Sequence, residues 1–505
     1  MRCGLPSLSD QDSNVTARPE IAWRYVVPVA FAELVVLVAF ANRYGYHRDE
    51  LYFRVAARHP AAAYDDQGAL TPLIGRLGEG LFGETPRGLR VLSAVTASLV
   101  VLVVALIARE LGARAAGQVV AAAGAGASAY VLAVGHLLTT SGLDLLVWTT
   151  VVLLVARILA GGDERLWLAV GVIVGIGLEN KQQPLLLVAA LAVGLAVDRQ
   201  LQRVLRSPWL WAGMAAGLVL WLPYLVWQGT HGWPQLELAE DIRRDEGGES
   251  RATLLPLQLL LLGPLLAPIV LVGLWGLLRD TALRPWRPLG WAYLALLLVI
   301  FVTSGKPYYA APFLLVLLAS GSVLVERWLV TPVRRVAIGL ALLVSVLVSA
   351  LVVLPVLPAD RIGDTPIAEL NEDAIETIGW PEFVRAVADV YDGLALDERA
   401  GTVIFAGNYG EAGAIDRYGP ALGLPRPYSG HNSFARFGIP AGTTGPVVVV
   451  GYREPSVDFV GCRRVATFDN GANVENEEQG GSLFVCQRPR LPWTEAWPEL
   501  RHLDA

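Results

Sequence analysis

The sequence predicts a mainly α-helical polytopic membrane bundle followed by a soluble α/β domain. Of its 505 residues, 54% are hydrophobic and only 17% are charged, whereas soluble domains usually carry about 25% charged residues. Residues 25–357 form apolar runs separated by short polar loops, and residues 358–505 have the composition of a soluble chain. We therefore expect a cytoplasmic tail over 1–24, a transmembrane domain over 25–357 and an extracytoplasmic α/β domain over 358–505.

Apolar runs that could cross a bilayer, which requires about 20 mostly apolar residues, occur throughout the transmembrane domain. The fifth and sixth runs are shorter than this and flank Glu179-Asn180-Lys181, so they form either two short helices or one broken element. The eleven predicted runs begin near Tyr25, Val91, Ala116, Leu143, Leu166, Pro184, Pro208, Leu254, Leu289, Tyr308 and Val336.

The loops between these runs differ in their arginine content, which predicts their orientation. Arginine-rich loops, such as those with Arg109 and Arg157, alternate with loops that have almost none. We expect the arginine-rich loops and the N-terminus to be cytoplasmic in a multi-pass plasma-membrane protein. Eleven spans place the C-terminal domain outside, and ten would place it inside. Cys462 and Cys486 favour the outside, because a disulfide persists in an oxidising compartment, although they could be two unrelated buried thiols.

The longest loop between spans, residues 42–90, faces outward in this topology. It is dense in arginine, against the general trend, and a phosphate-bearing ligand at the outer leaflet would explain that density. Asp49 to His59 is expected to form a short helix along the membrane surface. Asp49 lies at its start, where a carboxylate is a good N-cap.

Two acidic groups in this loop are candidates for chemistry. Asp49-Glu50 could supply a general base that accepts the proton of an attacking hydroxyl, or simply cap a solvated helix. Tyr64-Asp65-Asp66-Gln67 could place a second carboxylate near the first or bind a divalent cation through oxygen ligands. A turn with solvated acids is the structural alternative for this second group.

The only two lysines of the chain, Lys181 and Lys306, both fall at the predicted outer mouth of the bundle. A lysine there can hold a phosphate as a point charge, or extend to the interface without a ligand. Asp144 ends another outer loop at a helix start. Glu33 lies inside the first span, where a carboxylate is costly and is a functional candidate. The net charge of −6 and the lack of a basic stripe give no indication of a nucleic-acid partner.

Several segments resemble the bacterial family-39 glycosyltransferases of the C-type (GT-C) superfamily, relatives of the protein O-mannosyltransferases and of the lipid A aminoarabinose transferase. The run from Tyr46 to Phe53, then Tyr64 to Gln67 and Leu70 to Leu73, is similar to the family's first outer loop. Lys306-Pro307-Tyr308-Tyr309 is similar to its late outer loop. Asn408 to Ala412 and Tyr428 to Asn432 are like the C-terminal domain of actinobacterial-type members. One departure is Gly68-Ala69, where members often have two prolines.

The resemblance implies an inverting transferase with a polyprenyl-phosphate sugar donor and an acceptor hydroxyl on a lipid, glycan or protein at the outer face of the membrane. Asp49 would be the base and Glu50 would orient the site. Lys181 and Lys306, with Arg48 or Arg54, would bind the leaving phosphate. No cofactor is implied with certainty, and a divalent metal at Asp65 and Asp66 is left open. Further substrate-binding candidates are Tyr46, His47, Tyr64, Asp66, Gln67, Asp144, Tyr308 and Tyr309.

The soluble domain alternates helical and strand-like patterns. Pro381 to Tyr391 and Glu411 to Tyr418 are expected to be helical. Short apolar runs at 402–405 and 447–451 suit buried strands, and 483–486 is expected to be the last strand. Cys462 precedes one strand and Cys486 ends another, so a disulfide between neighbouring strands is feasible. Acceptor recognition is the expected role of this domain.

Two other classes of function fit the same spans. A transporter or flippase of lipid-linked sugars would share the outer charges, but it would favour internal repeats, which are not evident. A non-catalytic membrane scaffold would use the C-terminal domain to bind a partner. Asp49→Asn separates these readings, because it should abolish only sugar transfer.

Overall fold

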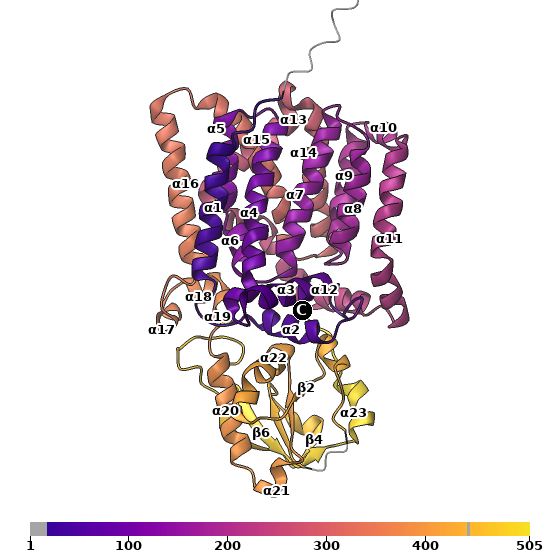
Figure 1. The fold of residues 1–505 in the computed structure, drawn as a ribbon, viewed down its shortest axis with the longest axis vertical. Helices are drawn as coiled ribbons and strands as arrows, with labels where there is room; N and C mark the ends of the chain where they lie inside the picture. Colours follow the sequence, from indigo (N-terminus) through magenta and orange to yellow (C-terminus); the bar gives the residue numbers. More distant parts are fainter. Residues whose placement is uncertain (1–17, 442–444, 505) are drawn as a thin grey trace, which may run out of the picture.

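The computed structural model describes residues 18–441 and 445–504, so residues 1–17 of the predicted tail lie outside the described part. One end of the helix bundle carries a small α/β domain (Figure 1). The bundle helices are α1 (Trp23–Phe40), α4 (Pro86–Glu110), α5 (Ala115–Gly126), α6 (Ala129–His136), α7 (Thr140–Leu159), α8 (Leu166–Leu178), α9 (Pro184–Val197), α11 (Pro208–Thr230), α12 (Pro234–Leu262), α13 (Ala267–Arg279), α14 (Arg287–Thr303), α15 (Ala311–Trp328) and α16 (Pro332–Val353).

Within the described residues, seven helices are long and apolar enough to cross a membrane, or up to nine if each of two bent pairs is one span. The bent pairs are α5 with α6, at 56°, and the second half of α12 with α13, at 88°. The predicted fifth and sixth runs form two separate shorter helices, α8 and α9. Every run predicted from the sequence therefore contains apolar helix, and the chain is a multi-pass membrane protein.

Burial separates the core of the bundle from its periphery. In α15, 83% of the most apolar stretch is buried, whereas in α11 and α16 the share is 17%. The outer faces of these two helices carry large apolar side chains, including Leu218, Val226, Leu340 and Leu347. Exposed apolar surface on this scale is stable in lipid and not in water.

The long loop after α1 folds into two helices at the end of the bundle, α2 (Arg48–Arg58) and α3 (Leu70–Phe82) (Figure 1). The short helix predicted from Asp49 is thus present, but its predicted N-cap is wrong. His47 caps α2, because its Nδ1 accepts the Asp49 backbone N–H at 3.2 Å, and its own N–H donates to Glu50 at 2.9 Å. The carboxylate of Asp49 is therefore not used for capping.

The C-terminal domain is built on a five-stranded sheet with the order β2-β1-β3-β6-β5. The central pairs β1/β2 and β1/β3 are parallel, and β6 runs antiparallel to both of its neighbours. The strands are β1 (Val403–Ala406), β2 (Pro427–Ser429), β3 (Val447–Val450), β5 (Arg463–Thr467) and β6 (Ser482–Cys486).

Helices cover both faces of this sheet, which explains why β1 and β3 are apolar at every position. Ile404 and Val448 face α20 (Trp380–Asp392) and α22 (Tyr409–Tyr418). Phe405 and Val449 face α23 (Trp493–Leu500). The predicted α/β layering, with helices near 381–391 and 411–418 and strands near 402–405 and 447–451, is confirmed.

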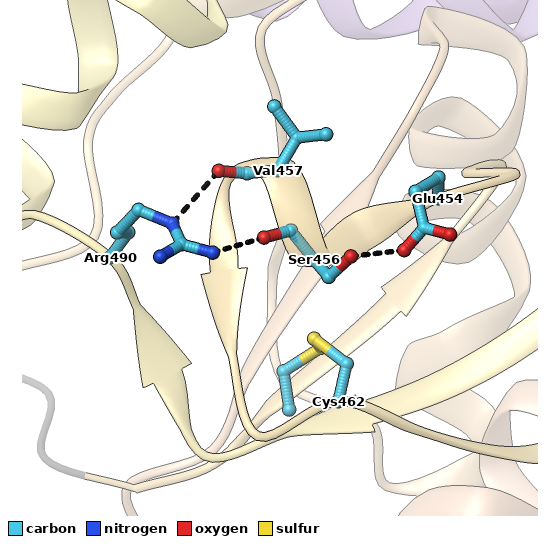
Figure 2. The surroundings of a disulfide bond; sticks show 6 residues. Glu454, Ser456, Val457, Cys462 and Arg490 are labelled. Carbon is cyan, nitrogen blue, oxygen red and sulfur yellow. Dashed lines mark hydrogen bonds between the residues drawn. A yellow bond between two sulfur atoms is a disulfide. The ribbon is translucent and has the colours of Figure 1, made fainter.

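The prediction that 483–486 is the last strand is wrong, because the short strand β7 (Arg488–Pro489) follows and pairs with β4 (Phe459–Val460). The sulfur atoms of Cys462 and Cys486 are bonded, which links the start of β5 to the end of β6. Figure 2 shows this region, where the Arg490 guanidinium donates to the carbonyl oxygens of Val457 and Ser456. A covalent bond and a charged side chain therefore fasten this edge of the domain.

Candidate functional site

The two acids of the predicted catalytic pair have different environments. Glu50 is fully buried and accepts hydrogen bonds from Arg90 (2.7 and 2.8 Å), the Leu138 N–H (2.9 Å) and the His47 N–H. These bonds join α2 to α4 and to the segment before α7. With its oxygens occupied in this way, Glu50 fixes the position of α2, while the neighbouring Asp49 lines a cavity.

The C-terminal domain lies directly against α2, and two glycines of α22 allow the close approach. A Cβ atom at Gly410 would lie 2.8 Å from the Cβ of Arg48. A Cβ atom at Gly413 would lie 2.8 Å from the Cβ of Leu51 and 2.9 Å from its carbonyl carbon. Contacts this short are not tolerated between carbon atoms, so glycine is required for the observed packing.

This packing brings Tyr409, the first residue of α22, to Asp49. The Tyr409 hydroxyl donates to Oδ1 of Asp49 at 2.8 Å. Its ring stacks on Tyr52, with centroids 4.8 Å apart, and the Arg48 guanidinium lies 5.4 Å from its centre. Burial first, and then the Asp49 carboxylate, raise the pKa of Tyr409 well above its usual value. Tyr409 therefore remains protonated and acts as a hydrogen-bond donor.

A cavity of about 730 Å³ opens beside Asp49, between the bundle and the C-terminal domain. Such a volume is typical of small-molecule sites, which span about 300–1,000 Å³. Both lysines of the chain line this cavity together with Asp49. The ammonium group of Lys181 lies over the rings of Tyr308 and Tyr309, at 5.9 and 5.8 Å. Five predicted site residues besides Asp49 line it, namely His47, Arg48, Lys181, Lys306 and Tyr308.

The other predicted site residues lie outside the cavity lining. Arg54 pairs with Glu79 at 2.7 Å and its guanidinium lies 5.0 Å from the ring centre of Tyr46. Tyr64 donates to the Ala56 carbonyl at 2.8 Å. Asp144 is buried at the start of α7. Tyr309 contacts the cavity-lining Lys181 through its ring, and Gln67 is buried.

The second acidic group is also held by protein contacts. Asp65 accepts a bidentate pair from Arg436, at 2.6 and 2.7 Å, and a hydrogen bond from the Ser433 hydroxyl. Asp66 accepts from the Tyr52 hydroxyl at 2.7 Å, and its burial raises the pKa to about 7. Among the side chains that the structure describes, no group of three or more from His, Cys, Asp or Glu is arranged to hold a metal ion.

The arginines of the long loop are largely engaged by carboxylates, so ion pairs account for much of their density. Arg90 pairs with Glu50, Arg54 with Glu79, and Arg58 with Asp416 of the C-terminal domain. Arg48 contacts Glu376 and Glu477 and is the one cavity-lining arginine in the described part of the chain. A phosphate ligand is therefore not needed to explain the abundance of arginine in this loop.

Sequence reasoning missed several residues that line the cavity. Asn408 and Tyr409 were part of the family resemblance but were not assigned to the site, and Glu376 and Glu477 were not singled out. His431 entered the sequence analysis only as part of the run from Tyr428 to Asn432 that carries the family resemblance. No local spacing links these positions to Asp49. The Gly410 and Gly413 pair on the helix that begins at Tyr409 was the one available signal of a close helix contact.

Comparison with known proteins gives a family match over part of the chain and two solved structures with a similar fold. Residues 66–227 match the family described as "Dolichyl-phosphate-mannose-protein mannosyltransferase". The fold is similar to that of ArnT from Cupriavidus metallidurans bound to undecaprenyl phosphate, with a TM-score of 0.57 and 17% identity over 92% of this chain and 98% of that one.

ArnT from the same organism in the apo state gives a TM-score of 0.56 and 15% identity over the same shares of the two chains. No curated protein sequence matches. The predicted GT-C fold and the predicted resemblance to glycosyltransferases are confirmed.

Proposed function

We propose that this chain, a membrane glycosyltransferase with the GT-C fold, transfers a sugar from a polyprenyl-phosphate carrier to an acceptor hydroxyl with inversion at the anomeric carbon. One observation carries the proposal: Asp49 lines the same 730 Å³ cavity as Lys181 and Lys306, the only lysines of the chain. A base for the acceptor and two cations for a phosphate are thus gathered in one space.

The chemistry follows from this placement. The acceptor hydroxyl attacks the anomeric carbon while Asp49 takes its proton, which is general-base catalysis. The new bond joins the acceptor oxygen to the sugar, and the bond that breaks joins the sugar to the phosphate oxygen. Polyprenyl phosphate leaves with the electron pair of that bond. Tyr409 occupies Oδ1 of Asp49, so Oδ2 is the oxygen that receives the proton.

The lysines act on the leaving group. Negative charge grows on the phosphate oxygen as the bond to the sugar breaks, and fixed cations stabilise that charge more in the transition state than in the ground state. Removing one such preorganised group elsewhere costs roughly 3 kcal/mol. Lys181 is positioned by the rings of Tyr308 and Tyr309, which limits the reorganisation required during the reaction.

The placement of the site at one end of the bundle suits a lipid-linked donor. Such a donor keeps its chain in the bilayer and its phosphate at the interface, so the base must lie at the membrane surface. Asp49 is in α2 at the end of the bundle, next to the C-terminal domain (Figure 1). The family of the sequence match is named for a lipid-phosphate sugar donor, and the ArnT structure holds undecaprenyl phosphate. Both support a donor of this class.

We assign this end to the outer face of the plasma membrane and the N-terminus to the cytoplasm. The loops rich in arginine meet at the opposite end, where Glu110 pairs with Arg18, Arg109 and Arg157. Basic loops of this kind favour the cytoplasmic side. The disulfide between Cys462 and Cys486 supports an oxidising compartment for the C-terminal domain.

The test is sugar transfer by the full-length chain in proteoliposomes. Labelled sugars on undecaprenyl phosphate serve as donors and a bacterial envelope fraction serves as acceptor. Asp49→Asn should reduce transfer at least about 100-fold, in line with the contribution of a general base. Lys181→Ala should weaken the binding of undecaprenyl phosphate about tenfold or more, because it removes one charge-assisted contact.

Arg58→Ala is the matched control for the lysine variant, because Arg58 is a cation of α2 that pairs with Asp416 and does not line the cavity. It should leave undecaprenyl phosphate binding unchanged. Wild-type transfer rates in a folded Asp49→Asn variant would refute the proposal. Translocation of the lipid-linked sugar without transfer would instead indicate a flippase.

A further inference from the structure

We propose that the part of the cavity formed by the C-terminal domain and residues 372–376 is the acceptor subsite, and that its charge selects an uncharged or cationic, hydroxyl-rich acceptor over an anionic one. This inference rests on the proposed function, since it names the acceptor class of the same site. It follows from how charges are distributed around the cavity.

The cations and the carboxylates come from different parts of the molecule. Lys181 and Lys306 come from the bundle, beside Tyr308. Away from the lysines, the lining is dominated by an acidic wall, which we define as Glu372, Asp373, Glu376, Glu477 and Asp504. Asp49 lies beside this wall, at the N-terminus of α2.

Positive charge near the acidic wall is already engaged. The Arg48 guanidinium contacts the carboxylates of Glu376 and Glu477. The Nε2 atom of His47 lies 3.3 Å from Glu376 and 3.9 Å from Asp373. Burial first, and then the charges of His502 and Arg48, lower the pKa of His431 to about 3, so its ring is neutral. Burial alone would lower the pKa of His47, but the hydrogen bond to Glu376 raises it to about 9, so its ring is a second cation. Among the described residues, the carboxylates of Glu372, Asp373, Glu376 and Glu477 therefore outnumber the two cations beside them, Arg48 and His47.

An anionic acceptor would bring a further negative charge into this wall. Like charges repel more strongly in a partly buried cavity than in bulk water, and repulsion of this kind is a common source of specificity. A hydroxyl or an ammonium group, by contrast, can donate to these carboxylates. Neutral hydrogen-bonding groups that suit a polyol also line the cavity, namely Thr139, Thr140, Ser141, Asn408 and Tyr409.

The uneven distribution of charge around the cavity also favours different positions for the donor and the acceptor. A phosphate is attracted to the lysines and repelled by the acidic wall, so the donor is oriented with its phosphate toward the bundle. The acceptor then approaches from the side of the C-terminal domain, where Asp49 and Tyr409 meet. In this arrangement the acceptor hydroxyl lies opposite the leaving phosphate, as inversion requires.

The experiment measures binding of three matched β-1,4-linked trisaccharides to the full-length chain in nanodiscs, by saturation-transfer NMR at millimolar concentration. Cellotriose is neutral, the glucosamine trimer is cationic and the glucuronate trimer is anionic. The variant Glu372→Gln/Asp373→Asn removes two charges from the wall without breaking the Arg48 pairs. The control Asp389→Asn/Asp397→Asn removes two charges from exposed positions outside the cavity.

We expect the wild type and the control to bind cellotriose and the glucosamine trimer at least about tenfold more tightly than the glucuronate trimer, because like charges held against each other disfavour binding by at least this much. The Glu372→Gln/Asp373→Asn variant should bring the glucuronate trimer to within about threefold of cellotriose.

Three results would overturn the inference: equal or tighter binding of the glucuronate trimer by the wild type, unchanged discrimination in the wall variant, or no binding of any trimer. Undecaprenyl phosphate binding is measured on the same preparations. If the wild type does not bind undecaprenyl phosphate, the proposed function is contradicted. If it binds undecaprenyl phosphate, a negative result with the trimers concerns the acceptor subsite alone.

Discussion

The hydroxyl of Tyr409 donates a 2.8 Å hydrogen bond to the carboxylate of Asp49, across 360 positions of sequence. One partner belongs to the loop after the first bundle helix and the other to the C-terminal domain. The site is therefore completed only when the domain is docked. The C-terminal domain thus contributes a residue that positions the proposed base.

Tyr409→Phe tests this positioning role. The variant keeps the ring stacked on Tyr52 but loses the bond to Oδ1. Hydrogen bonds to charged groups contribute about 1.5–3 kcal/mol, so we expect kcat for sugar transfer to fall roughly 10- to 100-fold. The KM for the donor and the affinity for undecaprenyl phosphate should not change. Tyr391→Phe, which removes a hydroxyl bonded to the Arg399 carbonyl elsewhere in the domain, is the control. Equal losses in both variants would show a general effect on stability.

Gly413→Ala tests the docking of the domain. Replacing a glycine by alanine inside a helix normally stabilises it by about 0.5–1 kcal/mol. Here the added methyl group would meet Leu51 at 2.8 Å, so α22 must move away from α2 and withdraw Tyr409. We expect transfer to fall at least about tenfold, with little further loss when Tyr409→Phe is added, because coupled residues are not additive. Gly80→Ala has open space around it and should be silent. Additive effects of the two changes would contradict the docking account.

Glu411 makes the stability of the C-terminal domain depend on pH. Burial first, and then the neighbouring carboxylate of Glu478, raise its pKa from 4.5 to about 8. The folded domain therefore holds a proton that the unfolded chain releases near its ordinary pKa. Its contribution to stability is complete below about pH 4.5 and is lost as the pH rises to about 8.

Glu411→Gln should remove this dependence. The amide oxygen can still accept the N–H groups of Gly407 and Asn408, at 3.0 and 3.2 Å, that cap α22. The variant should thus melt close to the wild type at pH 5 and at a higher temperature at pH 8.5. Thermal melts of the full-length chain in detergent at the two pH values provide the measurement. The sign of this effect would be contradicted if the wild type melted at a higher temperature than the variant at pH 8.5.

The bond between Cys462 and Cys486 should stabilise the C-terminal domain. It closes a segment with a sequence separation of 24 residues, and disulfides of this kind typically contribute about 2–4 kcal/mol, mainly by restricting the unfolded chain. A reducing agent should therefore lower the melting temperature of the wild type to that of Cys462→Ser/Cys486→Ser, and have no effect on the double variant. A double variant that melts like the oxidised wild type would refute this contribution.

Much of the architecture could be predicted because it depends on local patterns. Apolar run length locates the bundle helices, and the spacing of apolar residues predicts the short helix at Asp49 and the core strands of the soluble domain. The sequence predicts that Asp49, Lys181 and Lys306 lie in loops on the same side of the membrane, and in the structure all three line one cavity.

What the sequence did not predict depends on contacts between distant segments. His47 rather than Asp49 caps α2, because the helix already begins at Arg48 and the His47 ring accepts the Asp49 backbone N–H. Glu50 is held by Arg90, forty positions away. The acidic wall draws on residues 372–376, Glu477 and Asp504, which only the folded chain brings together. Acid and arginine residues that look like ligands in the sequence are often each other's partners in the structure, as Arg436 and Asp65 are.

A structure of the Asp49→Asn variant with an undecaprenyl-phosphate sugar bound tests the central claim most directly, because the variant should hold the donor without turning it over. We predict that the phosphate lies between Lys181 and Lys306 and that the anomeric carbon faces residue 49 at the edge of the acidic wall. A donor phosphate bound elsewhere, or an anomeric carbon facing away from residue 49, would contradict the assignment of Asp49 as the base.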